Sequence, residues 1–206
     1  ASMIVTPSDH LITREIEFVK SIEAGFGFVE SHDALLTLGI KPTRPETGYG
    51  YIQIGQPVDD GISKVKTFTE KPDLDLAKVF VESGEFFWNS GIFLWKASAI
   101  LKALHVYAAD LMATFDKGAE KFGTSEETAF IEKEFPGCVN ISIDYAVMER
   151  ASNVYVECVD FGWNDLGTWS ALYDNSPKNQ EANVTQTCRV LAYNSIGNIF
   201  AVNGDK

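Results

Sequence analysis

Short apolar runs alternate with amphipathic stretches along most of this chain. The apolar runs have the length of β-strands and are rich in β-branched and aromatic residues. They occupy residues 3–6, 32–40, 51–55, 65–70, 91–95 and 153–161. Stretches with helical periodicity lie between them, at residues 13–24, 76–83, 97–115, 126–135 and 144–150. Strands that alternate with helices predict an α/β fold, in which helices cover the faces of a sheet.

Polar residues and glycines mark where several of these helices begin and end. Asp73 is placed to cap the helix over 76–83, and Gly84 is placed to end it. Ser142 is placed in the same way before 144–150. Gly25 is predicted to end the first helix, because glycine is common just past a helix C-terminus.

The two ends of the chain differ from its middle. Residues 3–6 are all apolar or β-branched, so we expect a fully buried strand there, and such a strand this near the first residue indicates further structure before it. From about residue 182 the pattern changes to short β-like pieces broken by Gly197 and Gly204. We therefore expect a main domain at residues 1–178 and the start of a separate β element at 179–206.

The composition narrows the class of protein. Of the 206 residues, 45% are hydrophobic and 22% are charged, as in ordinary globular domains. The sequence shows neither an apolar run of membrane-spanning length nor a signal-peptide pattern. Three widely spaced cysteines without a CxxC pair indicate neither a disulfide framework nor a zinc site, so we expect a cytoplasmic protein.

The net charge of −12 also bears on the partners of the chain. Nucleic acid is not an expected partner, because its phosphates would be repelled. The same repulsion applies to any phosphorylated substrate. Such a substrate needs a divalent cation, or individually placed lysines and arginines, at its binding site.

Two aspartates stand where strands give way to helices. Asp9 follows the strand at 3–6, and Asp165 follows the strand at 153–161 and its turn. Ligands of open α/β sheets bind beyond the carboxyl ends of strands, so two such carboxylates can jointly hold a hard cation between phosphates. Taken singly, the simpler interpretation is a cap on the following helix, by Asp9 or Thr13 and by Asp165 or Thr168. The pattern alone favours the caps.

Three further segments carry groups suited to a sugar phosphate. Lys71 can neutralise a phosphate as a point charge, and Glu70 beside it can accept hydrogen bonds from hydroxyls. Asn89 adds an amide, and Gly50 permits close approach of the backbone to a ligand. Each of these residues has an ordinary alternative as part of a turn, and none is specific by itself. The histidines show no paired spacing, so a histidine-based metal site is not expected.

Taken together and in order, these segments are specific. Six motifs follow one another: Pro7-Ser8-Asp9-His10-Leu11-Ile12, Lys41-Pro42-Thr43-Arg44-Pro45-Glu46-Thr47-Gly48-Tyr49-Gly50-Tyr51-Ile52, Phe68-Thr69-Glu70-Lys71-Pro72, Trp88-Asn89-Ser90-Gly91-Ile92-Phe93, Ile143-Asp144-Tyr145-Ala146-Val147-Met148-Glu149 and Trp163-Asn164-Asp165-Leu166-Gly167-Thr168-Trp169. The series resembles the bacterial mannose-1-phosphate guanylyltransferases over nearly the whole chain.

The resemblance implies a fold and a reaction. The fold is a Rossmann-like (GT-A-like) nucleotidyltransferase sheet, mixed, with helices on both faces, here incomplete at the N-terminus and followed by a β-rich C-terminal element. The reaction makes GDP-mannose and pyrophosphate from GTP and α-mannose 1-phosphate, by in-line attack of the sugar phosphate on the α-phosphorus of GTP. The resemblance also implies a homodimer formed through the C-terminal β element.

The resemblance further implies which residues contact metal and phosphate. Asp9 and Asp165 would hold Mg²⁺ between the two phosphates. Lys71 would neutralise the phosphate of mannose 1-phosphate.

Sugar contacts are implied in the same way. Glu70 and Asn89 would hydrogen-bond the sugar hydroxyls, and Gly50 would contact the ring through its backbone. Asp144 lies in one of the motifs but receives no firm role, beyond ordering the helix that begins near it.

One feature of the family does not occur in the sequence. Family members begin with a Gly-Gly-x-Gly-x-Arg-type loop followed by a lysine, which hold the nucleotide phosphates, and no such segment is found in these 206 residues. We therefore expect that these residues alone do not bind GTP productively and are inactive. Two alternatives stay open: a related sugar-1-phosphate nucleotidyltransferase of other base or sugar specificity, and a non-catalytic regulatory subunit that binds a sugar phosphate.

Overall fold

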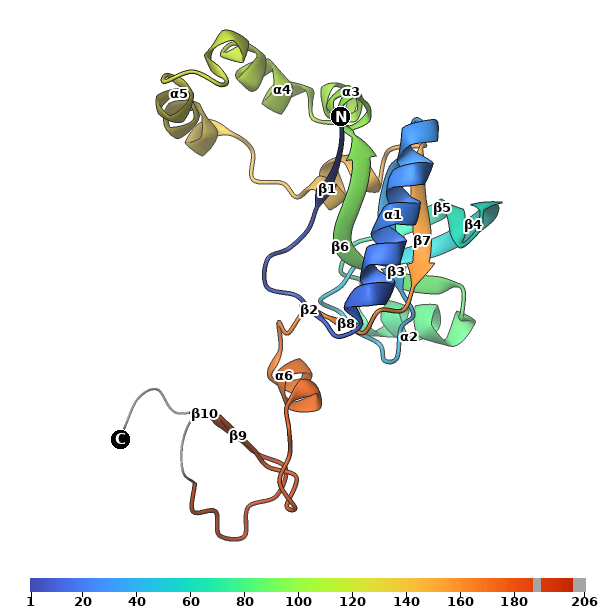
Figure 1. Cartoon of the computed structure of the whole chain (residues 1–206), viewed down its shortest axis with the longest axis vertical. Helices are drawn as coiled ribbons and strands as arrows, with labels where there is room; N and C mark the ends of the chain where they lie inside the picture. The colour runs from blue at the N-terminus through green and yellow to red at the C-terminus, as the bar shows by residue number, and fades with distance from the viewer. Residues whose placement is uncertain (187–189, 202–206) are drawn as a thin grey trace. The chain divides into compact units, whose positions relative to one another are not determined.

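The computed structural model describes residues 1–186 and 190–201 (Figure 1). They form two compact units. The first, here called the sheet unit, comprises Ala1–Ser8 and Ile12–Trp163, and the second comprises Asp9–Leu11 and the chain from Asn164 onward. The expected domain boundary at residue 178 stays a prediction. Within the described ranges, no helix is long and apolar enough to cross a membrane.

A six-stranded sheet forms the centre of the sheet unit. Its strands lie in the order β1-β6-β3-β7-β5-β4, and β4 also pairs with β6. β3 and β7 are parallel, while the other pairs are antiparallel. The strands are β1 (Ser2–Val5), β3 (Leu35–Ile40), β4 (Tyr51–Asp59), β5 (Ile62–Thr69), β6 (Phe86–Lys96) and β7 (Val154–Val159). The expected α/β class with a mixed sheet is confirmed.

Helices cover both faces of the sheet, as two neighbouring residues of β3 show. Leu36 packs in one buried cluster with Phe28 of α1 (Glu15–Ser31). Leu35 packs in another, together with residues of α3 (Ala97–Tyr107). Successive residues of a strand point to opposite faces. The strand is therefore apolar at nearly every position because both of its faces are covered.

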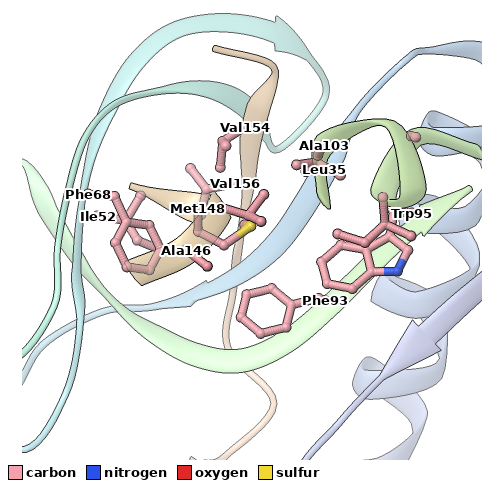
Figure 2. Packing of buried hydrophobic residues seen from close by; sticks show 13 residues of the cluster. Leu35, Ile52, Phe68, Phe93, Trp95, Ala103, Ala146, Met148, Val154 and Val156 are labelled. Atoms are coloured by element: carbon pink, nitrogen blue, oxygen red, sulfur yellow. The ribbon is translucent and has the colours of Figure 1, made fainter. Parts of the chain in front are cut away.

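Figure 2 shows the second of these clusters, on the face of Leu35. Met148, which is 1% exposed, comes from the π-helical turn η3 (Asp144–Met148), and Phe93 and Trp95 come from β6. This packing fixes the turn against the sheet. It matters for the site described below, because the same turn begins with Asp144.

The remaining elements lie outside the six-stranded sheet. In the sheet unit they are α2 (Leu74–Ser83), α4 (Ala109–Asp116), η1 (Ala119–Lys121), α5 (Glu127–Glu134) and η2 (Phe135–Gly137). The second unit holds α6 (Trp169–Asn175), β9 (Val184–Gln186) and β10 (Ile199–Ala201). Two-residue strands β2 (Leu11–Ile12) and β8 (Trp163–Asn164) form a further small sheet.

Both predicted ends of α2 are confirmed. The Asp73 carboxylate accepts a hydrogen bond from the Leu76 amide at 2.9 Å, as a helix cap does. Gly84 follows the helix with a left-handed φ of 71°, a conformation that glycine adopts without steric cost.

The predicted end of the first helix at Gly25 is wrong. α1 continues through this glycine to Ser31. A Cβ at Gly25 would lie 3.0 Å from Leu94 Cδ2 and 3.1 Å from Leu36 Cδ2. The glycine lets the helix approach the sheet closely, and it does not terminate the helix.

The expected full burial of the first strand is also wrong. Among the described strands, β1 lies at the edge of the sheet and pairs with β6 alone. Its alternate residues Met3 and Val5 are 42% and 45% exposed, while Ile4 packs against the α1-side cluster. An apolar run alone does not distinguish a central strand from an edge strand.

Two further predictions need adjustment, whereas the short β-like pieces near the C-terminus are present in the described residues. The helical stretch 97–115 is two helices, separated at Ala108, whose φ of −135° is not helical. The helix expected after Ser142 is the π turn η3, and the Ser142 hydroxyl accepts a hydrogen bond from the Tyr145 amide at 3.4 Å. The β-like pieces near the C-terminus pair in parallel as β9 and β10. Cys188 and Gly204 lie outside the described residues.

Candidate functional site

Three of the predicted site residues lie side by side across three strands. β4 lies between β5 and β6, and Tyr51 pairs with the last residue of β5 on one side and the third residue of β6 on the other. Continuing both registers by one residue places Gly50 opposite Glu70 and opposite Asn89. The backbone N–H of Asn89 donates to the Gly50 carbonyl at 2.8 Å. Directly opposed residues share a face of the sheet, so the side chains of Glu70 and Asn89 meet over Gly50.

This row, Glu70–Gly50–Asn89, explains the glycine. A Cβ at Gly50 would overlap the Oε2 atom of Glu70 and would lie 3.3 Å from the Cβ of Asn89. No larger residue leaves room for the Glu70 carboxylate in this position. The geometry thus assigns Gly50 a steric role, which the sequence pattern does not reveal.

Glu70 and Lys71 form an unequal ion pair. Glu70 Oε1 and Lys71 Nζ are 2.7 Å apart, but the glutamate side chain is 7% exposed and the lysine side chain 57%. Burial raises the pKa of Glu70 despite its bond to Lys71, whereas that bond raises the pKa of Lys71. Burial is the largest influence on the pKa of Glu70, and the bond is the largest influence on the pKa of Lys71. We attribute this difference to the unequal burial of the two side chains. Glu70 Oε2 is buried without a hydrogen-bond partner among the described residues.

The backbone at Lys71 is strained. Its φ is +47°, in the left-handed region, although it precedes Pro72. A residue before proline normally takes an extended conformation, and left-handed non-glycine residues cluster at functional sites. The Lys71 amide donates to the Tyr49 carbonyl at 3.2 Å. This bond fixes the turn that carries both Glu70 and Lys71.

A bulge in β6 aims the side chain of Asn89. Between the pairs Thr37↔Phe93 and Gly39↔Asn89, β3 advances by fewer residues than β6. The extra residues of β6 include Gly91, whose φ is +71°. Bulges of this kind redirect side chains and are frequent beside active sites. This segment, for which a turn was the ordinary alternative, is therefore an irregular part of the strand.

Hydrogen bonds orient the Asn89 amide. Its Oδ1 accepts from the Thr37 hydroxyl at 2.8 Å and from the Gly91 amide at 3.3 Å, and its Nδ2 donates to Asp144 Oδ1 at 2.9 Å. The residue is 8% exposed. All of these bonds are consistent with one orientation of the amide.

Two acids that hydrogen-bond the row Glu70–Gly50–Asn89 had no role assigned from the sequence. Asp144 bonds Asn89, and Glu149 Oε1 accepts a hydrogen bond from the Glu70 backbone amide at 3.0 Å. Both belong to the motif Ile143–Glu149, which was the available signal. Their partners lie more than fifty residues away along the chain, so spacing alone could not identify them.

Asp9 and Asp165 both belong to the second unit. Neither caps a helix: α1 has no side-chain cap, and α6 is capped by Thr168, whose hydroxyl accepts from the Ala171 amide at 3.1 Å. Asp165 Oδ1 accepts from the Gly167 amide at 3.1 Å. The helix-cap interpretation is therefore wrong for both aspartates, whereas Thr168 is confirmed as a cap.

The two aspartates act on a common neighbour. Partial burial lowers the pKa of His10, and the carboxylates of Asp9 and Asp165 oppose this by favouring the charged imidazole. In the described part of the chain, no group of three or more His, Cys, Asp and Glu side chains could hold a metal ion. Mg²⁺ is commonly bound by one or two carboxylates completed by waters and substrate phosphates. The donor set fits a cation that arrives with phosphates.

Sequence comparison relates this chain to known proteins. The family profile described as "Nucleotidyl transferase" matches residues 1–182. A mannose-1-phosphate guanylyltransferase of Escherichia coli is 38% identical over 187 residues, which are 88% of this chain and 40% of that protein. One of Salmonella muenchen is 39% identical over 197 residues, covering 95% and 41%. The chain thus spans about two fifths of the length of these relatives.

Solved structures are similar as well. A protein named mannose-1-phosphate geranyltransferase, from Thermus thermophilus, has a TM-score of 0.77 at 29% identity, over 90% of this chain and 52% of its own. A protein named mannose-6-phosphate isomerase, from Helicobacter pylori, has a TM-score of 0.67 at 30% identity, over 80% and 64%. These likenesses extend over most of the described sheet and helices.

Proposed function

We infer the function of this chain from one premise: it belongs to the nucleotidyl transferase family. We propose that it carries the sugar-phosphate and metal-binding residues of an enzyme that makes GDP-mannose and pyrophosphate from GTP and mannose 1-phosphate. Relatives with that activity in their names, at 38% and 39% identity, support this choice. The proposal includes GTP as the nucleotide, a homodimer and a cytoplasmic location.

The row Glu70–Gly50–Asn89, with Lys71 at its end, is the observation that carries the proposal. A sugar phosphate requires a cation for its phosphate and hydrogen-bonding groups for its hydroxyls. Lys71 offers an ammonium group on a side chain that is more than half exposed, and the buried Oε2 of Glu70 lacks a partner among the described residues. An unsatisfied buried carboxylate oxygen costs free energy. A ligand hydroxyl would remove that cost.

The reaction requires positioning and charge neutralisation. An oxygen of the sugar phosphate forms a bond to the α-phosphorus of GTP, and the bond from that phosphorus to the bridging oxygen breaks as pyrophosphate leaves. Lys71 would hold the attacking phosphate and offset its charge. Glu70 would orient the sugar by accepting a hydroxyl hydrogen bond. Together these contacts contribute through proximity and electrostatic stabilisation.

Nucleotidyl transferases of this family typically use a divalent metal ion. We propose that the ion is Mg²⁺ and that Asp9 and Asp165 hold it. Bound there, it would neutralise charge on the phosphates. A chain with a net charge of −12 needs such a cation to accept two phosphorylated substrates.

Binding of mannose 1-phosphate to the 206-residue chain, measured by calorimetry with Mg²⁺ present, tests the proposal. Lys71→Ala should weaken binding by roughly tenfold or more, because a charge-assisted hydrogen bond is lost. Lys78→Ala is the matched control: Lys78 lies on α2, and its side chain is 50% exposed. Gly50→Ala should also weaken binding, while Gly48→Ala, where a Cβ would meet nothing closer than 3.6 Å, should not.

The outcomes separate the alternatives. Equal affinity for glucose 1-phosphate would favour a related enzyme of other sugar specificity. Failure of the complete gene product to release pyrophosphate from GTP and mannose 1-phosphate, despite binding the sugar phosphate, would favour a regulatory subunit. Pyrophosphate release by the 206 residues alone would contradict the expectation that they are inactive.

A further inference from the structure

The π turn η3 places two acids on one face of the chain. Its defining hydrogen bond runs from the Glu149 amide to the Asp144 carbonyl, at 2.9 Å, across five residues. In an α-helix, residues five apart point in directions about 140° apart, since each residue turns by about 100°. The wider turn brings Asp144 and Glu149 to the same side. Single π turns of this kind are frequent at functional sites.

Each of these two acids holds one member of the row Glu70–Gly50–Asn89. Asp144 Oδ1 accepts from the side-chain amide of Asn89 at 2.9 Å, and Glu149 Oε1 accepts from the backbone amide of Glu70 at 3.0 Å. The hydrophobic residues of the same turn are buried against the sheet. This packing fixes the backbone that carries both acids.

Asp144 determines which way the Asn89 amide points. The Thr37 hydroxyl can donate or accept, so it does not distinguish the oxygen of the amide from its nitrogen. The Gly91 amide can only donate and an ionised Asp144 can only accept, so both require the observed orientation. The Gly91 bond is long, at 3.3 Å, against 2.9 Å for the Asp144 bond. Asp144 is thus the stronger of the two constraints.

The charge of Asp144 also acts on Lys71. Burial raises the pKa of Asp144, and the nearby ammonium of Lys71 opposes that rise. Conversely, the bond between Lys71 and Glu70 is the largest cause of the raised pKa of Lys71, and the charge of Asp144 raises it further. Both effects require that Asp144 and Lys71 lie in the same cluster.

We propose that Asp144 is a positioning residue of the sugar site: it fixes the Asn89 amide so that the second Nδ2 hydrogen is available to a ligand oxygen. The identity of that ligand, a sugar phosphate, rests on the proposed function. An amide nitrogen has two hydrogens, and Asp144 takes one of them. The remaining hydrogen is a donor of fixed direction beside the acceptor Glu70.

Three variants of the 206-residue chain separate this role from a merely structural one. Asp144→Ala removes the acceptor and should weaken mannose 1-phosphate binding by roughly tenfold. Asp144→Asn keeps an acceptor oxygen and should retain more of the affinity than the alanine variant. The exchange Asn89→Asp with Asp144→Asn keeps one carboxylate and one amide, and leaves Thr37 and Gly91 an acceptor.

The exchange is the decisive variant. It preserves the internal hydrogen bonds, but at residue 89 an acceptor replaces the Nδ2 donor that would bind the ligand. Binding should therefore stay at least roughly tenfold weaker than in the wild type, while the fold is retained. In the complete gene product, KM for the sugar phosphate should rise more than kcat falls. Asp75→Asn, at a carboxylate on α2 that is 94% exposed, is the control. Restored binding in the exchange variant, or normal binding in Asp144→Ala, would overturn the proposal.

A ligand-free measurement distinguishes failure of this inference from failure of the proposed function. NMR of the side-chain amide of Asn89 should show one slowly exchanging Nδ2 hydrogen in the wild type and none in Asp144→Ala. If the wild type binds no mannose 1-phosphate but shows this difference, the proposed function fails and the positioning of Asn89 by Asp144 stands. If the exchange rates are equal in both proteins, the positioning role is refuted.

Discussion

A glutamate side chain lies in the middle of the sheet, at residue 157 on β7. It is 8% exposed, and its Oε2 has no hydrogen-bond partner among the described residues. Burial raises the pKa of Glu157 to about 7, and a hydrogen bond with Ser21 only partly offsets this. This carboxyl group therefore keeps its proton to a higher pH than an exposed glutamate does.

The raised pKa of Glu157 predicts a dependence of stability on pH. Between the unfolded pKa of 4.5 and the folded value of about 7, the folded state binds more protons than the unfolded state. The free energy of unfolding contributed by this group therefore falls as the pH rises through that window. Glu157→Gln removes the titration, so its stability relative to the wild type should increase from about pH 5 to about pH 7.5. Urea unfolding at several pH values measures the difference.

The control for that experiment is Glu82→Gln, at an exposed glutamate of α2. Its stability curve should run parallel to that of the wild type across the same range. If the Glu157→Gln curve is parallel as well, the group does not titrate with a raised pKa in the folded protein.

The residues of the candidate site were only partly predictable from the sequence. Motifs identified Gly50, Glu70 and Asn89, and their adjacency follows from the strand register. The register depends on which strands pair, and the sequence does not specify that. The bond between Asp144 and Asn89 could not be foreseen for the same reason, because it joins two segments through the tertiary fold.

Among the elements, α1 offers a matched pair of glycines. A Cβ at Gly27 would meet nothing within 4 Å, whereas one at Gly25 would lie 3.0 Å from Leu94 Cδ2 and 3.1 Å from Leu36 Cδ2. Both leucines are 0% exposed and so have little room to move. A side chain therefore has room at Gly27 but not at Gly25, although both glycines lie in one helix.

Alanine substitutions at these positions should change stability in opposite directions. Gly27→Ala should stabilise the protein by about 0.5–1 kcal/mol, because alanine favours the helix. Gly25→Ala should destabilise it by about 1 kcal/mol or more, because overpacking outweighs that gain. Thermal and urea unfolding of both variants measure the changes. Stabilisation by Gly25→Ala would show that the leucines can adjust.

The elements also show what hydrophobic pattern can predict. The alternation of strands and helices identified the central strands and α2 with its two ends, because those signals are local. It failed at Gly25 and at β1, where the decisive facts are a close approach between helix and sheet and the lack of a second neighbouring strand among the described residues. Both are properties of packing, which a periodic pattern does not encode.

For the whole molecule, the two compact units differ in how they are stabilised. The sheet unit has three clusters of buried apolar residues, and β3 is buried on both faces. In the described part of the second unit, α6 has seven residues and buries Ala171. Asn183, 1% exposed there, is held by polar contacts, donating to the Ser195 carbonyl at 2.7 Å and accepting from the Asn198 amide at 2.9 Å.

This difference predicts unequal protection against hydrogen exchange. Amides of β3 should exchange only when the sheet unit unfolds, whereas those of α6 should exchange through local opening, because opening α6 exposes little apolar surface. We expect the free energies of opening to differ by on the order of 3 kcal/mol or more, which is roughly a hundredfold or more in exchange rate. Native-state exchange followed by mass spectrometry, on peptides covering 35–40 and 169–175, measures it. Equal protection of both peptides would mean that the two units unfold as one cooperative body, and that the hydrogen bonds around Asn183 stabilise the second unit as effectively as apolar packing stabilises the first.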